Sequence, residues 1–293
     1  MAALFILLLV HFIPRIGATV PEIDFSLPAE GPSVPTTLRV VTFNIQDTPV
    51  VSSHGPERMR AIAAALCELD PDIVGFQESF ISQDRAILIE ELRACSRLQY
   101  HQYFPSGVMG SGLLVSSALP IVEISFMKFS QSNPLYKVWE GDWWAGKGVA
   151  AVRIALADAG GFVDVFNTHA QAGYGSSTYE AVRTAQMAEL AEFVNRNRSN
   201  MAPALLVGDM NCRPGDQDYE TAVSGAGLLR QMADDSGVDH IFAVENSAYS
   251  FETISTIRIE REVSLARGKT AMLSDHSGFM SVVQVVPQSG RSP

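Results

Sequence analysis

The chain has 293 residues, a formal net charge of -11 and a pI of about 5.0. Hydrophobic residues make up 47% of it and charged residues 18%, a composition that supports a sizeable core and excludes wholesale disorder. An acidic chain does not attract polyanions through its overall field, which argues against a nucleic-acid-binding protein.

The N-terminal residues have the pattern of a targeting segment. An apolar run, Leu4–Val10, is followed by Pro14 and by the small residues Gly17 and Ala18. The run is too short for a membrane-spanning helix and is typical of a secretory signal peptide over residues 1–18. A buried strand or an uncleaved membrane anchor is the alternative. We therefore expect a secreted or lumenal protein, with membrane association as a second option.

The rest of the chain predicts an α/β fold. Residues 19–37 are rich in proline and are expected to form an extended lead-in to a single domain at 38–287, with a tail at 288–293. Strands are expected at 38–44, 72–78, 113–116, 121–129, 148–156, 162–168, 204–208, 238–244 and 278–286, and helices at 57–69, 82–95 and 178–195. The irregular alternation favours a two-sheet β-sandwich flanked by helices.

The three cysteines, Cys67, Cys95 and Cys212, are too few for a disulfide scaffold. Cys67 lies on an apolar helical stretch, where a buried thiol is expected. One disulfide plus a free thiol is the alternative, and the sequence leaves that choice open. The sequon Asn197–Ser199 is usable for glycosylation only in a secreted protein.

Polar side chains stand within or at the ends of the apolar strands. Glu78 ends one strand and Asp209 ends another. A carboxylate in such a place is costly unless it is paired or bound to a cation, and Mg²⁺ prefers carboxylate, water and phosphate oxygens. Taken singly, each of these residues is more often structural. The further strand-end residues of this kind are Asn44, His169, Asn211, Asp239, Asp275 and His276.

Histidine at such a position suits proton transfer. A neutral imidazole accepts a proton from water near neutral pH when a carboxylate orients its other nitrogen. His276 is the candidate base, and Asp239 is the candidate orienting group.

Together these segments resemble a known superfamily. The order of the motifs is that of the endonuclease/exonuclease/phosphatase superfamily, which the chain resembles from about Leu38 to Val286. The matching segments are Thr42–Asn44, Phe76–Glu78, Asn167–His169, Gly208–Asn211, Val238–Ile241 and Ser274–His276. The resemblance implies a DNase I-like four-layer α/β sandwich.

A narrower resemblance is to the neutral sphingomyelinases. It rests on Thr168–Ala172, on Gly110–Leu113 followed by Leu119–Ile121, on Gly141–Gly148, and on Arg267–Gly268 before the last motif. The chain departs from that group in two ways: we expect no hydrophobic anchor C-terminal to the domain, and the stretch between Asn211 and Asp239 is short. Gln46 stands where base-excision nucleases carry an acid, which favours the lipid branch.

The resemblance implies roles for the metal-binding residues and the base. Glu78, helped by Asn44, would bind Mg²⁺, with Mn²⁺ as the alternative, and Asp275 would be a metal ligand or would support one. His276, oriented by Asp239, would be the general base that activates water.

The resemblance also implies roles at the phosphate. Asp209 would position the nucleophile or approach the metal, Asn211 would bind the phosphate, and His169 would donate to a phosphate oxygen. Lys147 is expected to contact a phosphate. It ends a Gly-x-x-x-x-Gly-Lys match that lacks the Ser or Thr and the helix of a nucleotide-binding loop.

All three tryptophans, Trp139, Trp143 and Trp144, fall in one short segment. Trp143 and Trp144 are expected to contact the bilayer or the apolar tails of the substrate, since indole rings favour the membrane interface. Core packing is the alternative.

The resulting hypothesis is a Mg²⁺-dependent, phospholipase C-type phosphodiesterase. It would hydrolyse sphingomyelin, or a related choline phospholipid, to ceramide and phosphocholine at a membrane surface. No nucleic-acid partner is expected, and no protein partner is inferred. A nuclease of the same fold would need a basic groove. A catalytically inactive binding module would have lost Glu78, Asp209 or His276, and the chain keeps all three.

Overall fold

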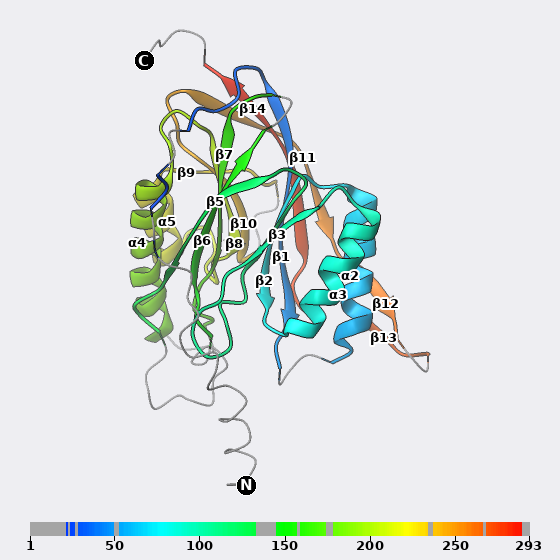
Figure 1. The fold of residues 1–293 in the computed structure, drawn as a ribbon. Coiled ribbons are helices and arrows are strands. Elements are labelled where there is room, and N and C mark those ends of the chain that lie inside the picture. Colours follow the sequence, from blue (N-terminus) through cyan, green and yellow to red (C-terminus); the bar gives the residue numbers. More distant parts are fainter. Residues whose placement is uncertain are drawn as a thin grey trace.

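The computed structural model describes residues 22, 24–26, 29–49, 53–132, 145–156, 159–173, 178–233, 237–265 and 268–288 (Figure 1). Within them, two six-stranded sheets pack face to face. The first has the strand order β11-β14-β1-β2-β4-β3, and the second has the order β5-β6-β7-β8-β10-β9. Strands β12 and β13 pair as a separate hairpin beside α2.

The bounds of the elements are as follows. The first sheet contains β1 Thr36–Asp47, β2 Ile73–Ser79, β3 Tyr100–Tyr103, β4 Leu114–Ser117, β11 Tyr249–Ile259 and β14 Gly278–Pro287. The second contains β5 Ile121–Lys128, β6 Gly148–Ala155, β7 Phe162–His169, β8 Ala204–Asp209, β9 Leu228–Arg230 and β10 Asp239–Val244. The hairpin is β12 Glu262–Ser264 and β13 Thr270–Met272, and the helices are α2 Gly55–Leu69, α3 Ser82–Cys95, α4 Thr178–Asn197 and α5 Gln217–Ala226.

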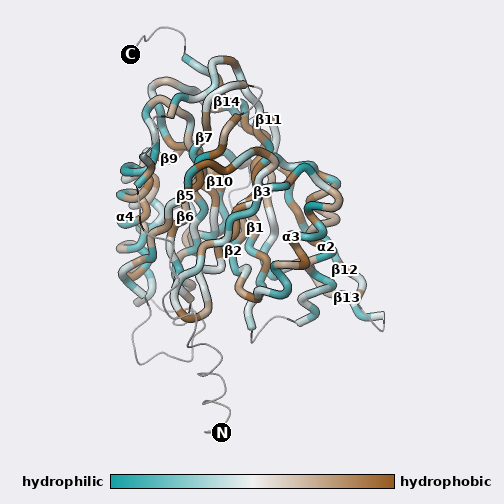
Figure 2. Tube along the Cα trace, viewed as in Figure 1, coloured by the Kyte–Doolittle hydropathy of each residue, from teal (hydrophilic) through white to brown (hydrophobic). Residues whose placement is uncertain are grey.

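Helices cover the outer face of each sheet, so the predicted two-sheet sandwich flanked by helices is confirmed (Figure 1). One apolar core lies between the sheets, a second lies under α4 and α5, and a third lies under α2 and α3. Figure 2 shows the apolar strands in the middle and hydrophilic residues on the outer helix faces. Burial of apolar surface in these three layers is the main stabilising term of the fold.

The centre of each sheet is a parallel strand pair joined by a helix. In β1-α2-β2 and in β7-α4-β8, the connecting helix lies between two parallel neighbours. Helix α2 begins with Pro56 in its first turn and buries Met59, Ile62 and Leu66 at helical spacing. Both units direct the carboxyl ends of their parallel strands to one rim of the sandwich.

The expected strands and helices are all present among the described residues, with ends shifted by at most three residues. Helix α5 and the strands β3, β9, β11, β12 and β13 were not predicted. The domain limits stay a prediction. None of the helices within the described ranges combines the length and the hydropathy that a membrane span requires.

The expectation of a buried thiol at Cys67 is wrong, because Cys67 forms a disulfide with Cys95. Helices α2 and α3 both run back from the ends of parallel strands, so they are parallel to each other and their C-terminal turns are neighbours. The two Cα atoms lie 5.8 Å apart, which is within the range of a disulfide. Cys212 is free and buried, and burial raises the pKa of its thiol.

Candidate active site

Six of the predicted residues meet at the rim where the parallel strands end. Asn44 and Glu78 lie near the ends of β1 and β2, and His169 and Asp209 end β7 and β8. His276 precedes β14, which is antiparallel to β1, and Asp239 begins β10, which is antiparallel to β8. Asp239 and His276 therefore lie at the same rim as the other four residues. We call the six residues Asn44, Glu78, His169, Asp209, Asp239 and His276 the site row.

The order of the strands sets the order of the site row. In the first sheet β14, β1 and β2 are neighbours, so His276, Asn44 and Glu78 follow one another. In the second sheet β10, β8 and β7 are neighbours and carry Asp239, Asp209 and His169 in the same direction. Because β14 packs on β10, β1 on β8 and β2 on β7, each member of one sheet faces its counterpart in the other.

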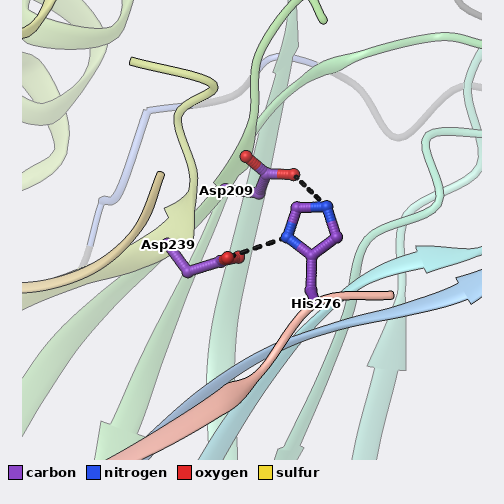
Figure 3. Close-up of side chains that lie close together, drawn as sticks. All are labelled: Asp209, Asp239 and His276. Carbon is purple, nitrogen blue, oxygen red and sulfur yellow. Dashed lines mark hydrogen bonds and ion pairs between the residues drawn. The ribbon is translucent and has the colours of Figure 1, made fainter. Parts of the chain in front are cut away.

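His276 and Asp239 form a hydrogen-bonded pair at one end of the site row (Figure 3). The Nδ1 atom of His276 lies 2.8 Å from Oδ2 of Asp239, and its Nε2 lies 3.8 Å from Oδ2 of Asp209. A carboxylate bound to Nδ1 fixes the proton there and leaves Nε2 as the acceptor. This is the orientation that the sequence predicted for a general base.

Asn44 links the two carboxylates at the centre of the site row. Its Nδ2 atom donates to Asp209 Oδ2 at 2.9 Å and to Glu78 Oε1 at 3.2 Å. Its Oδ1 accepts the backbone N–H of Gln46 at 3.0 Å. The amide therefore presents its nitrogen to the carboxylates, and an oxygen ligand from Asn44 would require the amide to rotate.

His169 and Lys147 occupy the other end. The Nζ atom of Lys147 is 3.0 Å from His169 Nε2 and donates to the carbonyl of Ala170 at 2.8 Å. His169 Nε2 also lies 3.5 Å from Asp209 and 3.9 Å from Glu78. If Lys147 donates to Nε2, a donor role for His169 requires that this bond be exchanged for one to the substrate.

The remaining predicted residues differ in their placement. Asn211 is half-buried beside the site row; its Nδ2 donates to Ala170 O at 3.1 Å and its N–H donates to Asp209 Oδ1 at 3.0 Å. Asp275 is exposed, and its Oδ1 accepts a hydrogen bond from the Ser274 hydroxyl at 3.3 Å. Trp143 and Trp144 lie outside the described residues.

The backbone is strained where it turns the site side chains inward. Glu78 has φ 58° and Asn211 has φ 52°, and Gln46, two residues after Asn44, has φ 48°. Left-handed backbone at a residue other than glycine costs on the order of 1–3 kcal/mol and is concentrated at functional sites.

The site carboxylates are electrostatically uncompensated. Burial raises the pKa of Glu78, against the charge of Lys147 and the hydrogen bond from Asn44. Burial and the charge of Asp239 raise the pKa of Asp209 to about 6, and burial also raises that of Asp239. A site of this kind favours an added positive charge.

The pKa values of the two histidines are shifted in opposite directions. Burial lowers the pKa of His276, but the hydrogen bond to Asp239 and the charges of Asp209 and Asp239 outweigh it and raise the pKa to about 10. For His169, burial and then the charges of Lys147 and His276 lower the pKa well below its usual value. His276 therefore needs a nearby cation to become a neutral base, whereas His169 is neutral already.

The sequence did not reveal Arg58 as part of the site's support. Its guanidinium is buried and donates to the carbonyls of Leu273, Gln46 and Ile45, at 2.9 Å for the first and 3.2 Å for the second. It thereby ties the end of β1 to the loop that carries His276. The available signal was an arginine directly before Met59 on the inner side of an otherwise apolar helix.

Three groups in the described chain could hold a metal ion together. One ligand atom each of Asp209, Asp239 and His276 lies within 4.8 Å of the other two (Figure 3). The predicted set is centred instead on Glu78. Glu78 is linked to Asp209 through the Asn44 amide, and the facing atoms of Asp239 and His276 are already hydrogen-bonded to each other.

The fold is that of one large class of proteins. The chain belongs to the endonuclease/exonuclease/phosphatase family, whose model matches residues 41–276.

Relatives and solved structures that are similar to it include the following four. It is 34% identical over 201 residues to a putative neutral sphingomyelinase of Drosophila melanogaster, a match that covers 68% of this chain and 45% of the relative. It is 33% identical over 189 residues to an inositol phosphosphingolipids phospholipase C of Schizosaccharomyces pombe, a match that covers 64% of this chain and 44% of the relative. The chain thus spans less than half the length of these relatives.

The solved structures share the fold. Sphingomyelinase C from Streptomyces griseocarneus superimposes with a TM-score of 0.64 and 21% identity, over 84% of this chain and 99% of that one. Beta toxin from Staphylococcus aureus, in a mutant with bound magnesium ions, gives a TM-score of 0.66 and 17% identity over 84% and 99%.

Proposed function

We propose that this chain is a metal-dependent phosphodiesterase that cleaves sphingolipids in the manner of a phospholipase C. The observation that carries the proposal is the site row, which sets an oriented His276–Asp239 pair at one end and a carboxylate pair, Glu78 and Asp209, in the centre. This combination supplies a base for water and a seat for a cation. The names of the relatives support a sphingolipid substrate, although their full chains are about twice as long.

We propose Mg²⁺ as the metal, with Mn²⁺ as the alternative. The residues fit a hard divalent cation, because Glu78 and Asp209 offer carboxylate oxygens whose pKa values are raised, mainly by burial. Asp209 Oδ2 already accepts the Asn44 amide, which a cation would replace in part. Magnesium in a solved structure of the same fold agrees with this choice. When bound, the cation would polarise the phosphate and stabilise the charge that develops on it.

The chain's own residues would carry out the proton transfer. Asp239 holds the proton on Nδ1 of His276, so Nε2 takes a proton from the attacking water. The oxygen of that water bonds to phosphorus, the bond from phosphorus to the ceramide oxygen breaks, and the released oxygen takes a proton from solvent. The products are ceramide and the phosphorylated head group.

The phosphate would be held by donors next to His169 and Asp209. Lys147, which is buried next to His169, supplies a cation, and Asn211 supplies an amide. Donors fixed before the reaction stabilise the transition state without reorganising. We propose sphingomyelin, or a related choline phospholipid, as the substrate.

We also propose that the protein works in a secreted or lumenal compartment. The Cys67–Cys95 disulfide supports this location, because disulfides persist in oxidising compartments and are rare in the cytosol.

The test is a substrate panel with purified protein. Sphingomyelin, phosphatidylcholine, an inositol phosphosphingolipid and DNA are each assayed in excess chelator, and then with Mg²⁺ or Mn²⁺ added. We expect sphingomyelin to be cleaved only with added metal. His276→Ala should lower the rate about 10²–10⁴-fold, and the variant should stay folded.

The matched control is His54→Asn, which changes an exposed histidine in a left-handed backbone conformation that asparagine tolerates. It should keep the full rate. Full activity in excess chelator would show that the reaction does not need a metal ion. Cleavage of DNA in preference to lipid would show that the proposed substrate is wrong.

A further inference from the structure

A pocket of about 230 Å³ lies beside the site row, between the start of α3 and the connection from β3 to β4. It is larger than a cavity of about 150 Å³ that holds a benzene molecule. Most of its lining is apolar, with one guanidinium on the wall. The lining residues that matter here are Phe80, Arg85, Tyr103, Val108, Met109 and Gly110.

Two glycines make room for the aromatic rings of this pocket. Gly110 and Gly112 have φ values of 97° and 74°, which disfavour other residues. A Cβ on Gly110 would collide with the Tyr103 hydroxyl, and one on Gly112 would lie 2.7 Å from the Phe80 ring. Ser111 between them donates to the carbonyl of Phe104 and accepts the N–H of Leu113 at 3.0 Å. The Gly110–Leu113 motif therefore shapes one wall of the pocket.

The pocket continues the site row at the end opposite His276. In the first sheet the order after β14 and β1 is β2, β4 and β3. Glu78 lies near the end of β2, Gly110 precedes β4, and Tyr103 ends β3. The pocket is therefore next to Glu78 and separated from His276 by Asn44 and Glu78.

This position matters because the displacement at phosphorus is in line. Water activated by His276 enters from one side, so the leaving group departs on the opposite side. Along the site row, that side faces the pocket.

We infer that the pocket receives the leaving group of the reaction, the part of the sphingolipid that departs as ceramide, and that it holds the first stretch of its alkyl chain. This inference rests on the proposed function. Phe80, Val108 and Met109 provide the apolar contacts that an alkyl chain requires.

The charge on the wall argues against choline as the occupant. A quaternary ammonium group binds to the open faces of aromatic rings. The guanidinium carbon of Arg85 lies 3.6 Å from the centre of the Tyr103 ring and covers one face of it. Arg85 also donates to the carbonyl of Ser79 at 2.6 Å, which fixes its position. A second cation would be repelled there, whereas an uncharged chain would not.

The experiment compares two soluble phosphocholine esters that differ in the leaving group. One is a short-chain sphingomyelin kept below its micelle concentration. The other is 4-nitrophenyl phosphocholine, whose leaving group is a stable anion without an alkyl chain. Both are assayed with the wild type, with Val108→Ser and with Met109→Ser. The matched control is Val122→Ser, which removes an exposed valine at the start of β5, far from the site.

We expect each pocket variant to lower kcat/KM for the short-chain sphingomyelin about tenfold, the scale of one or two lost apolar contacts. Hydrolysis of 4-nitrophenyl phosphocholine should change less than twofold, and Val122→Ser should change neither rate. Val108→Ala replaces the serine variant if that protein does not fold.

Equal losses on both substrates, at an unchanged melting temperature, would assign the pocket to the shared head group and overturn the inference. Unchanged rates on both would also overturn it. A wild type that cleaves the nitrophenyl ester but not sphingomyelin would instead reject the proposed function, so the two failures are distinguishable.

Discussion

Asp47 is a buried carboxylate that follows Asn44 by three residues but takes no part in the proposed chemistry. Its Oδ2 accepts the N–H of Ile81 at 3.1 Å, and its Oδ1 has no partner among the described residues. Burial, and then the nearby charge of Asp84, raise the pKa of Asp47 to about 7. A pKa that differs between the folded and the unfolded protein makes the stability of the protein depend on pH.

The sign of that dependence follows from the raised pKa. Between about pH 4 and pH 7 the folded protein holds a proton on Asp47 that the unfolded chain has lost, so stability falls as the pH rises through this window. Asp47→Asn removes the proton exchange. In the variant we expect the free energy of unfolding to depend less steeply on pH, by up to about 1.4 kcal/mol per pH unit. The variant should also be more stable than the wild type at pH 8.

Urea unfolding in chelator at several pH values between 4 and 8 measures this slope. Glu90→Gln, which changes an exposed side chain of α3, is the control and should leave the slope unchanged. Parallel stability curves for the wild type and Asp47→Asn would show that Asp47 is not the group that titrates.

At the scale of single residues, the sequence predicted the members of the site row but not the residues that hold them in place. Glu78, Asp209 and His276 stand out because each interrupts or ends an apolar run, and that signal is local. The rings of Phe80 and Tyr103 carry no such signal, and the only signal for Arg58 is its place on the inner side of an apolar helix. Their roles arise from contacts with residues far away in the chain, such as Leu273 for Arg58. Lys147 was expected at the phosphate, but its bond to His169 was not foreseen.

At the scale of elements, the disulfide joins the C-terminal turns of α2 and α3. Those turns lead into the starting ends of β2 and β3, at the rim opposite the site row. The bond therefore constrains the helix layer without touching the proposed chemistry. It closes a loop between residues 28 positions apart, for which chain entropy gives a stabilisation of about 3–4 kcal/mol.

We expect the double variant Cys67→Ser, Cys95→Ser to lose about that much stability and to keep its rate at 25 °C, a temperature at which it should still be folded. A reductant should lower the unfolding midpoint of the wild type and leave that of the double variant unchanged. Cys212→Ala is the control, since Cys212 is not bonded to another cysteine and its variant should still respond to reductant. A wild type indifferent to reductant would mean that the bond does not form in solution.

Elements with strong periodicity were predicted, and the others were missed for identifiable reasons. Helix α2 and the buried strands β7 and β8 show clear apolar patterns. Strand β11 lies at a sheet edge, and a register shift beside Ile254 breaks its alternation, which leaves Ile254 57% exposed. Strands β9, β12 and β13 have three residues each, too few for a pattern.

At the scale of the whole molecule, the net charge of -11 would affect how the proposed enzyme approaches a lipid surface. Sphingomyelin and phosphatidylcholine are zwitterionic and exert little long-range force. Anionic lipids create a negative surface potential that repels a negative protein. The repulsion reaches across about 30 Å at 0.01 M salt and about 8 Å at 0.15 M.

The prediction concerns sphingomyelin hydrolysis in vesicles at a fixed metal concentration. At low salt, added anionic lipid should slow hydrolysis, because the negative surface lowers the local concentration of the enzyme. Raising the salt to about 0.15 M should remove most of the difference, since the charges are then screened. A short-chain sphingomyelin in solution is the control, and its hydrolysis should not depend on the anionic lipid. Faster hydrolysis on anionic vesicles at low salt would contradict the prediction and would mean that a local basic surface, rather than the net charge, governs the approach to the membrane.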